Sequence, residues 1–528
     1  MSRKDARPSL LRSTSVVGGN TLASRILGFL RDVVFARAFG AGTGMDVFVV
    51  AFQIPNFLRR LFAEGAFSQA FVPVLSEYQS TRSEAEVREL IDRVTGTLGA
   101  ILVALTALGI VIAPVLILVF APGFAQEPEK HALASDMLRL TFPYLLFISL
   151  TALAGAILNT WGRFGVPAFT PVLLNLVLIS AALWLAPHFD EPIMALAVGV
   201  FVAGLVQLAF QLPFLRRLHL LPRPRWGWRH PGVNKILNLM LPAIIGSSVA
   251  QINIIIDRII ASFLVTGSIS WLYYSDRLLE FPLGIFAIAL STVILPGLSR
   301  KHAEKSPDEF SATLDWALRL VILIAVPAAV ALFVLAGPLV ATLFNYGEFA
   351  VPGNAEMTRL SVMAYAVGLV AFTLVKVLAP GYFARQDTRT PVKISIVSLL
   401  ANIVLNVAIV VPMMRAGIAG AHAGLALATG MAAVLNAGLL FRGLRRDGVY
   451  RPLGGWGKLA LQSLLANVSM ALLLVWLAGG LDAWLAADAL GRAGRLAVCV
   501  IAGLGVYLLA LLAAGLRPAD LRPVHAAP

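Results

Sequence analysis

The stretch LGAILVALTALGIVIAPVLILVF, residues 98–120, decides the fold class, because its 23 residues include no charged side chain. A helix needs about 20 apolar residues to cross the hydrocarbon core of a bilayer. Similar runs recur along the chain of 528 residues, of which 59% are hydrophobic and only 13% are charged. An average soluble domain is about a quarter charged, so an ordinary soluble enzyme is excluded. The sequence predicts an all-α polytopic membrane protein.

The apolar runs do not fit a transmembrane β-barrel, whose strands of about ten residues alternate between apolar and polar side chains. Residues 98–120 show no such alternation. Runs bounded by Gly, Pro or charged clusters instead predict about fourteen transmembrane helices. Their ranges are 14–40, 46–75, 91–120, 136–158, 167–187, 192–215, 236–265, 270–299, 313–343, 358–384, 391–412, 418–442, 457–479 and 493–515.

The loops between these runs alternate between basic and weakly basic, as expected when Lys and Arg are retained on the cytoplasmic side. The basic set is Arg82 and Arg88; Arg163; Arg216, Arg217, Arg223, Arg225 and Arg229; Arg300, Lys301 and Lys305; Arg385, Arg389 and Lys393; and Arg442, Arg445, Arg446 and Arg451. This alternation predicts that both termini are cytoplasmic. It also accounts for most of the net charge of +14, so no nucleic-acid partner is expected.

An internal repeat divides the chain into two six-helix blocks. SQAFVPVLS (residues 68–76) resembles STVILPGLS (residues 291–299), and Pro73 and Pro296 are 296 − 73 = 223 residues apart. Asp32 and Asp257 begin a second matching pair at an offset of 257 − 32 = 225. Six helices preserve the chain direction, so we expect two pseudo-symmetric lobes related by an axis along the membrane normal. Two C-terminal helices remain outside the repeat.

The first two helices of each block carry charged residues within or beside their apolar membrane spans. A lone charge at the bilayer centre costs about 2.5 to 3.5 kcal/mol on insertion scales, so these side chains should face protein or water. We expect them to line a cavity between the lobes, in which several arginines would suit an anionic substrate. They are Arg25, Arg31, Asp32, Asp46, Arg59, Arg60 and Glu64 in the first block and Asp257, Arg258, Asp276, Arg277 and Glu280 in the second.

Signatures of catalysis and of metal binding are absent from the sequence. It has no phosphate-binding GxxxxGK[ST] loop and no HExxH motif. The single cysteine, Cys499, cannot form an intramolecular disulfide or a cysteine metal cluster. We therefore assign no catalytic residue and no metal ligand, and expect a transporter rather than an enzyme.

Three segments carry a family resemblance. Residues 24–78, SRILGFLRDVVFARAFGAGTGMDVFVVAFQIPNFLRRLFAEGAFSQAFVPVLSEY, resemble the N-terminal signature of the MurJ (MviN) family of bacterial lipid II flippases. SWLYYSDRLLEFPLGIFAIALSTVILPGLS (270–299) and GYFARQDTRTPVKISI (381–396) resemble two later family segments. The resemblance implies a member of the multidrug/oligosaccharidyl-lipid/polysaccharide (MOP) exporter superfamily, which moves lipid II to the periplasmic leaflet of the inner membrane by alternating access.

The resemblance also implies roles for particular residues. By position, the family's cavity arginines fall on Arg25, Arg31, Arg59 and Arg277, and the acidic partners or gating residues fall on Asp32, Asp46, Glu64 and Glu280. The partners implied are lipid II, with its undecaprenyl-pyrophosphate-linked disaccharide-pentapeptide, and membrane lipids. Some relatives bind a sodium ion, for which we assign no ligands here.

The expected organisation is a cytoplasmic N-terminal tail (1–13), a first lobe (14–217), a basic cytoplasmic linker (218–235), a second lobe (236–446) and a final segment with the last two helices and a cytoplasmic tail (447–528). Two alternatives stay open. A sibling exporter would carry another undecaprenyl-linked oligosaccharide or drugs, although a drug exporter should favour acidic and aromatic cavity residues. A membrane enzyme such as a polyprenyl-lipid glycosyltransferase would need catalytic groups in an extracytoplasmic loop, and those loops are short.

Overall fold

The computed structural model describes residues 10–60, 67–284 and 288–517. Within these ranges the chain is built from helices and contains no β-strand, which confirms the predicted all-α class. The chain forms two compact units, Met1–Gly267 and Ser268–Pro528.

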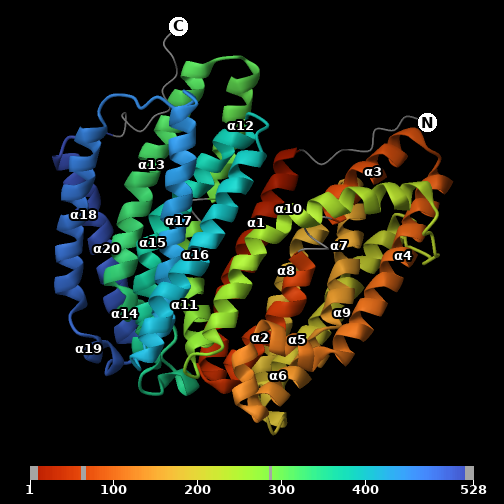
Figure 1. Cartoon of the computed structure of the whole chain (residues 1–528), viewed down its shortest axis with the longest axis horizontal. Helices are drawn as coiled ribbons and strands as arrows, with labels where there is room; N and C mark the ends of the chain where they lie inside the picture. The colour runs from red at the N-terminus through yellow and green to blue at the C-terminus, as the bar shows by residue number, and fades with distance from the viewer. Residues whose placement is uncertain (1–9, 61–66, 285–287, 518–528) are drawn as a thin grey trace. The chain divides into compact units, whose positions relative to one another are not determined.

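The first unit holds ten α-helices in the described residues (Figure 1). They are α1 (Leu10–Phe39), α2 (Thr43–Arg59), α3 (Ser68–Thr81), α4 (Glu84–Val111), α5 (Ala113–Phe120), α6 (Pro128–Thr141), α7 (Tyr144–Thr160), α8 (Gly165–Ser180), α9 (Met194–Arg217) and α10 (Pro231–Ala261). The start of α4 is encoded locally, because Ser83 and Glu86 form a reciprocal capping box around its first turn.

The second unit holds the ten remaining α-helices of the described residues (Figure 1). They are α11 (Ser268–Pro282), α12 (Ile288–Ala303), α13 (Pro307–Val334), α14 (Ala336–Leu343), α15 (Asn354–Phe383), α16 (Arg389–Arg415), α17 (Ala421–Arg446), α18 (Trp456–Ala478), α19 (Leu481–Leu485) and α20 (Ala489–Ala513). Helices α15 and α17 approach closely at Gly368 and Gly430, where a Cβ on Gly368 would lie 2.6 Å from the Gly430 Cα. Small residues permit this kind of contact between membrane helices.

Ten helical segments of the described chain are long and apolar enough to cross a membrane. The four other predicted spans, 14–40, 46–75, 236–265 and 270–299, are the first two of each six-helix block. The described part of 46–75 contains α2 and α3, and that of 270–299 contains α11 and α12. Every predicted range contains helix, so the structure is consistent with fourteen spans. These four ranges also carry the charged residues that the sequence places inside the bundle.

The duplication is visible in the backbone as well as in the sequence. Helices α4 and α5 recur with the same lengths as α13 and α14, at an offset of 307 − 84 = 223. Each pair is broken at a single residue, Ile112 (φ −90°, ψ 12°) or Leu335 (φ −89°, ψ 11°). Their separation, 335 − 112 = 223, equals that of Pro73 and Pro296. The two pseudo-symmetric halves predicted from sequence therefore share local geometry.

The boundary between the compact units falls after α10, at Gly267, and not within the predicted linker 218–235. Helix α10 packs against α3 and α4, and its side chains Val233, Ile236 and Met240 join the buried core formed with Phe71 and Leu90. The first unit therefore continues to Gly267. The limits of the inherited repeat stay a prediction from the sequence.

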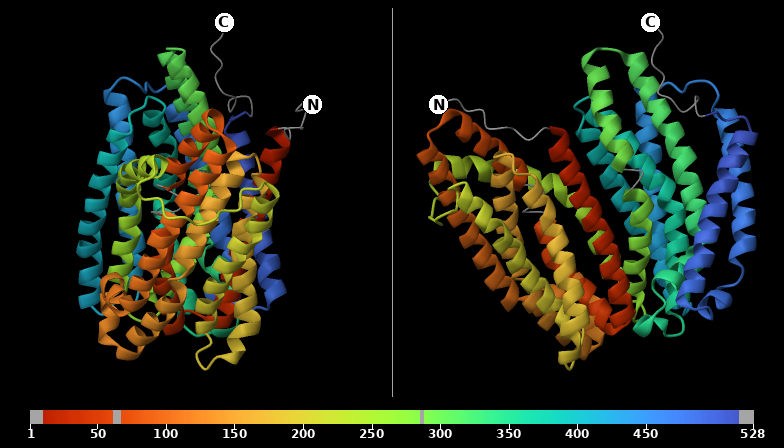
Figure 2. Two further views of the ribbon diagram at one scale, coloured as in Figure 1. Left: turned by 90° about the vertical axis from the view of Figure 1, so that its right-hand side faces the viewer. Right: turned by 180° about the vertical axis from the view of Figure 1, so that it is seen from behind.

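The last two long helices pack on the second unit, where α18 and α20 lie side by side (Figures 1 and 2). Arg492 of α20 is only 6% exposed, and its guanidinium donates to the carbonyl oxygens of Ala341 and Asn345 at 2.9 Å each. The hydroxyl of Tyr507 donates to the Leu323 carbonyl at 2.7 Å. These contacts fix the pair to α13 and to the end of α14.

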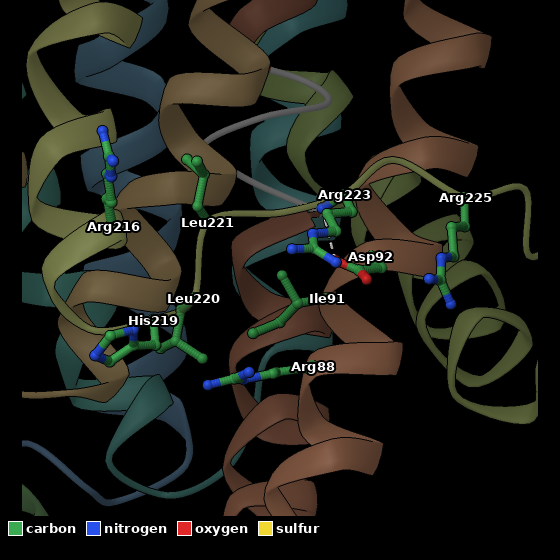
Figure 3. Close-up of a pocket in the computed structure, with 9 residues that line it drawn as sticks. All are labelled: Arg88, Ile91, Asp92, Arg216, His219, Leu220, Leu221, Arg223 and Arg225. Carbon is green, nitrogen blue, oxygen red and sulfur yellow. Dashed lines mark hydrogen bonds between the residues drawn. The ribbon is translucent and has the colours of Figure 1, made fainter.

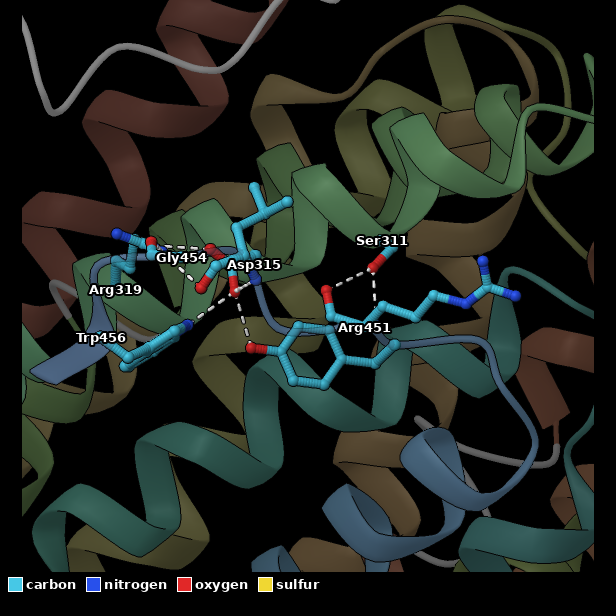
Figure 4. Close-up of polar contacts among 8 residues, drawn as sticks. Ser311, Asp315, Arg319, Arg451, Gly454 and Trp456 are labelled. Carbon is cyan, nitrogen blue, oxygen red and sulfur yellow. Dashed lines mark hydrogen bonds and ion pairs between the residues drawn. The ribbon is translucent and has the colours of Figure 1, made fainter.

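A buried carboxylate anchors the connector between α17 and α18, residues 447–455 (Figure 4). Asp315 of α13 is fully buried. Its Oδ1 accepts hydrogen bonds from the Tyr450 hydroxyl at 2.7 Å, the Trp456 Nε1 at 2.8 Å and the Leu453 amide at 3.1 Å. Its Oδ2 pairs with the Arg319 Nε at 2.6 Å. We call this arrangement the Asp315 clasp.

Candidate anion-binding site

The candidate site of the first unit begins with a polar cluster on α1. Asp32 is 1% exposed, and its Oδ1 accepts hydrogen bonds from the adjacent Arg31, from Nε at 3.0 Å and from Nη2 at 2.7 Å. The Nη1 of Arg31 donates to Oδ1 of Asn175 on α8 at 3.0 Å, and Nδ2 of Asn175 donates to the Ser24 carbonyl at 3.0 Å. We call Arg31, Asp32 and Asn175 the α1 polar cluster.

This cluster makes buried charge tolerable inside an apolar bundle. A carboxylate removed from water needs an opposite charge and hydrogen-bond donors. The Arg31 guanidinium supplies both to Asp32. The guanidinium also lies over the Phe35 ring, 5.5 Å from its centroid. Arg31 is therefore held in one position by three side chains from two helices.

Arg25 lies on α1 about two turns before Asp32, and it is exposed. The spacing of seven residues places Arg25 and Asp32 on one face of the helix, but the structure pairs Asp32 with Arg31 instead. Among the described residues, none forms an ion pair with the Arg25 guanidinium. Arg25 thus presents a positive charge that the α1 polar cluster does not neutralise.

Arg59 lies at the end of α2, where its Nε donates to Asn56 Oδ1 at 2.9 Å. The acidic residue predicted near it, Glu64, lies outside the described residues. Asp46 lies at the other end of α2 and is 2% exposed. Its Oδ2 accepts a hydrogen bond from the Gly267 amide at 2.8 Å, so this carboxylate holds the chain segment that follows α10.

Sequence reasoning missed the role of Lys130 in the same region. This lysine of α6 is only 4% exposed, and its Nζ lies 3.9 Å from Asp46 Oδ2 and 3.3 Å from Thr266 Oγ1. It also lies 4.8 Å from the centroid of the Phe124 ring. A buried ammonium needs such partners. One signal was present in the sequence, because Lys130 is a cation in one of the loop regions that otherwise carry few positive charges.

Asn175 was missed as well. It stands alone in the apolar run PVLLNLVLIS, residues 171–180, and a single amide in such a run is a sequence signal for an interhelical hydrogen bond. Its partner could not be read from the sequence, because Asn175 and Arg31 are 144 residues apart.

The second unit carries the other two predicted site residues on α11. Arg277 Nη1 and Glu280 Oε2 form a salt bridge of 2.5 Å, in which the side chains are 30% and 54% exposed. The Arg277 guanidinium lies 4.9 Å from the centroid of the Tyr273 ring. The two side chains lie one turn apart on the same side of α11, and the pair is accessible.

These arrangements suit recognition of an anion rather than catalysis. Each unit offers an arginine that is oriented by a neighbouring carboxylate, and a guanidinium can bind phosphate or carboxylate oxygens through two parallel hydrogen bonds. Within the described ranges, no group of three or more His, Cys, Asp or Glu side chains is placed to hold a metal ion.

A duplicated bundle of apolar helices, with oriented arginines in the first helices of each half, defines a multi-pass membrane transporter. The family model described as "Lipid II flippase MurJ" matches residues 35–490. The "Probable lipid II flippase MurJ" of Vibrio cholerae is 48% identical over 520 residues, which cover 97% of this chain and 98% of that protein. The "Lipid II flippase MurJ" of Burkholderia cenocepacia is 43% identical, with coverage of 97% and 99%. The chain belongs to the MurJ family.

Solved structures agree with this assignment. The structure titled "Lipid II flippase MurJ, inward closed conformation" superposes with a TM-score of 0.77 at 27% identity, and covers 94% of this chain and 97% of that chain. An inward-facing MATE family transporter of the MOP superfamily has a TM-score of 0.64 at 15% identity, with coverage of 80% and 95%. The second likeness shows a shared fold.

Proposed function

We propose that this protein flips lipid II, the lipid-linked peptidoglycan precursor, from the cytoplasmic to the periplasmic leaflet of the bacterial inner membrane. The similarity that carries the proposal is the 48% identity to a probable lipid II flippase over 97% of the chain. The α1 polar cluster supplies the chemical argument, because an oriented arginine inside an apolar bundle requires an anionic partner or an anionic cargo.

The chemistry of the cargo matches the side chains. Lipid II carries a pyrophosphate and a stem peptide with carboxylates, both of which guanidinium groups bind well. We assign the anion contacts to Arg25, Arg59 and Arg277, and we assign Arg31 a binding role in which Asp32 and Asn175 hold its orientation. The acidic residues Asp32, Asp46, Glu64 and Glu280 would keep the empty cavity from carrying a large uncompensated charge.

Depletion of the protein in cells, followed by a lipid II accessibility assay, tests the proposal. We expect lipid II to accumulate on the inner face of the membrane and to reappear on the outer face when expression is restored. An exporter of another undecaprenyl-linked oligosaccharide would leave lipid II accessibility unchanged. An enzyme that consumes lipid II would change its total amount rather than its sidedness.

The proposed orientation places both termini and residues 218–230 in the cytoplasm. The alternation of basic and weakly basic loops supports it. Single cysteines can report it in a Cys499→Ser background, since the native thiol is buried. A cysteine at Thr266 should react with an impermeant maleimide from the periplasm, and one at Arg229 should not. Labelling of both from the same side would overturn the orientation.

The proposal includes no resident cofactor, and the sodium ion that some relatives bind has no ligands assigned. Replacing sodium by potassium in the accessibility assay tests for ion coupling. We expect lipid II to reach the outer leaflet at an unchanged rate, and a strong fall in that rate would require a sodium site.

A further inference from the structure

The connector between α9 and α10, residues 218–230, is fixed to the surface of α4. The backbone amide of Arg223 donates to Asp92 Oδ1 at 2.7 Å, and that of Arg225 donates to the Asp92 carbonyl at 3.0 Å. Farther along, the Gly227 amide donates to Thr97 Oγ1 at 3.0 Å. A Cβ on Gly96 would lie 2.2 Å from the Arg225 carbonyl oxygen, so the missing side chain permits this close approach.

A pocket of about 330 Å³ opens between this connector and α4 (Figure 3). Its lining is strongly basic, with four arginines and one histidine against one carboxylate. In Figure 3 the guanidinium of Arg88 points toward the imidazole of His219, and Arg223 lies against Asp92. The lining residues are Arg88, Ile91, Asp92, Arg216, His219, Leu220, Leu221, Arg223 and Arg225. We call this the arginine pocket.

The positive charge of the arginine pocket is only partly balanced by the protein, because one carboxylate faces four guanidinium groups. Asp92, its one carboxylate, already accepts the Arg223 amide. Across the described ranges, no side chain forms an ion pair with the guanidinium groups of Arg88, Arg216, Arg223 or Arg225. Retention of basic loops in the cytoplasm explains why arginines occur in this connector. It does not explain why they surround a cavity whose connector side is hydrogen-bonded to α4.

The second repeat holds its own connector at the equivalent carboxylate. Asp315 is the repeat counterpart of Asp92, because 315 − 92 = 223. In the Asp315 clasp, Tyr450 and Trp456 donate hydrogen bonds to one oxygen of the carboxylate and Arg319 pairs with the other (Figure 4). Arg319 corresponds to Gly96 at the same offset, 319 − 96 = 223. The second repeat therefore holds its connector with one arginine and two aromatic side chains at the carboxylate, whereas four arginines line the pocket beside Asp92.

We propose that the arginine pocket binds the phosphate group of an anionic ligand, at a site separate from the proposed substrate cavity. Guanidinium groups bind phosphate oxygens through paired hydrogen bonds, and the volume lies at the lower end of the range for small-molecule sites, about 300 to 1,000 Å³. The chemistry fits a phospholipid headgroup and a free phosphate alike. Two neighbouring tryptophans favour the phospholipid.

Trp226 and Trp228 follow directly on the pocket-lining Arg225. Their rings stack with centroids 6.1 Å apart, and they are 59% and 50% exposed. Exposed tryptophans are typical of the membrane interface, where the ring contacts the headgroup region. Anionic lipids are also enriched in the cytoplasmic leaflet, next to basic segments. The surroundings of the pocket therefore favour a lipid headgroup as the source of the phosphate.

The test uses the full-length protein in detergent and measures binding of short-chain phosphatidylglycerol. The variant Arg88→Gln/Arg223→Gln removes two pocket charges and leaves the backbone bonds of the connector in place. The matched control, Arg442→Gln/Arg446→Gln, removes two charges near the end of α17. We expect binding to weaken about tenfold or more in the pocket variant, as for loss of charge-assisted hydrogen bonds, and less than twofold in the control.

A second variant and competition experiments complete the test. Arg88→Lys/Arg223→Lys keeps the charge but removes the paired donors, so it should bind more weakly than the native protein and more tightly than the glutamine variant. If inorganic phosphate does not displace the bound phosphatidylglycerol, the pocket binds a lipid headgroup. If inorganic phosphate displaces it as well as added phosphatidylglycerol does, the pocket binds a soluble anion. Equal weakening in the pocket variant and the control, or unchanged binding in the pocket variant, would overturn the proposal.

Discussion

Asp92 and Asp315 occupy equivalent positions 223 residues apart, and each accepts a backbone amide from the connector that follows the sixth helix of its own repeat. The Arg223 amide lies 2.7 Å from Asp92 Oδ1, and the Leu453 amide lies 3.1 Å from Asp315 Oδ1. The carboxylates differ in burial, because Asp315 is fully buried and Asp92 is partly exposed. The same contact should therefore contribute differently to stability in the two units.

Replacement of Asp315 by Ala should lower the free energy of unfolding by about 3 to 5 kcal/mol, as when one partner of a buried ion pair is removed. The loss leaves the Tyr450 hydroxyl and the Trp456 indole without their acceptor. Asp92→Ala should cost about 1 kcal/mol, the net value of one hydrogen bond. Thermal unfolding of both variants in detergent measures the difference. Equal losses would show that burial of Asp315 does not set its contribution.

The clasp also predicts a response to alkaline pH. Burial raises the pKa of Tyr450, and the neighbouring Asp315 carboxylate raises it further. A group whose pKa is raised in the folded state contributes stability that is complete below the unfolded pKa, about 10 for Tyr, and is lost as pH rises toward the folded pKa. The stability difference between the native protein and Tyr450→Phe should therefore be constant from pH 7 to about 9 and shrink above about pH 10. A difference that grows with pH would contradict this assignment.

Loss of the cavity arginines should abolish function without loss of the protein. Arg25→Ala, Arg31→Ala and Arg277→Ala should each fail to complement a flippase-depleted strain, because each removes a charge-assisted contact to the anion. Lysine should rescue poorly, since it lacks the paired donors. Arg82→Ala is the matched control, because Arg82 lies in an exposed ion pair with Glu86. Complementation by all three alanine variants at native membrane levels would remove the anion-cavity interpretation.

Asn175 should act through Arg31. Asn175→Leu removes the amide that accepts from the Arg31 guanidinium at 3.0 Å, so Arg31 loses its orientation while the Asp32 pair remains. We expect flipping to fall about tenfold, as for loss of a hydrogen bond to a charged group. The readout is a double-mutant cycle, in which Asn175→Leu should have little further effect once Arg31 is Lys. Additive losses would indicate that Asn175 serves only the packing of α1 against α8.

The sequence predicted the helical class, the repeat and the charged helices because these depend on composition and spacing along one chain. It did not predict which charges pair. Asp32 bonds with Arg31 rather than with Arg25, and the orientation of Arg31 depends on Asn175, which comes from a distant helix. The Asp315 clasp was equally hidden, since Tyr450, Leu453 and Trp456 lie about 140 residues from Asp315 and meet it only after the bundle packs. Pairing is decided by packing, which spacing alone does not specify.

The position of α10 in the first unit has a practical meaning for dividing the gene into two co-expressed fragments. A break within residues 218–230 would place α10 in a different fragment from its packing partners α3 and α4. It would also cut the connector that is hydrogen-bonded to α4. A break at Gly267 would keep Val233, Ile236 and Met240 with their partners in the core. The boundary between the compact units thus lies one helix later than the lobe boundary predicted from the sequence.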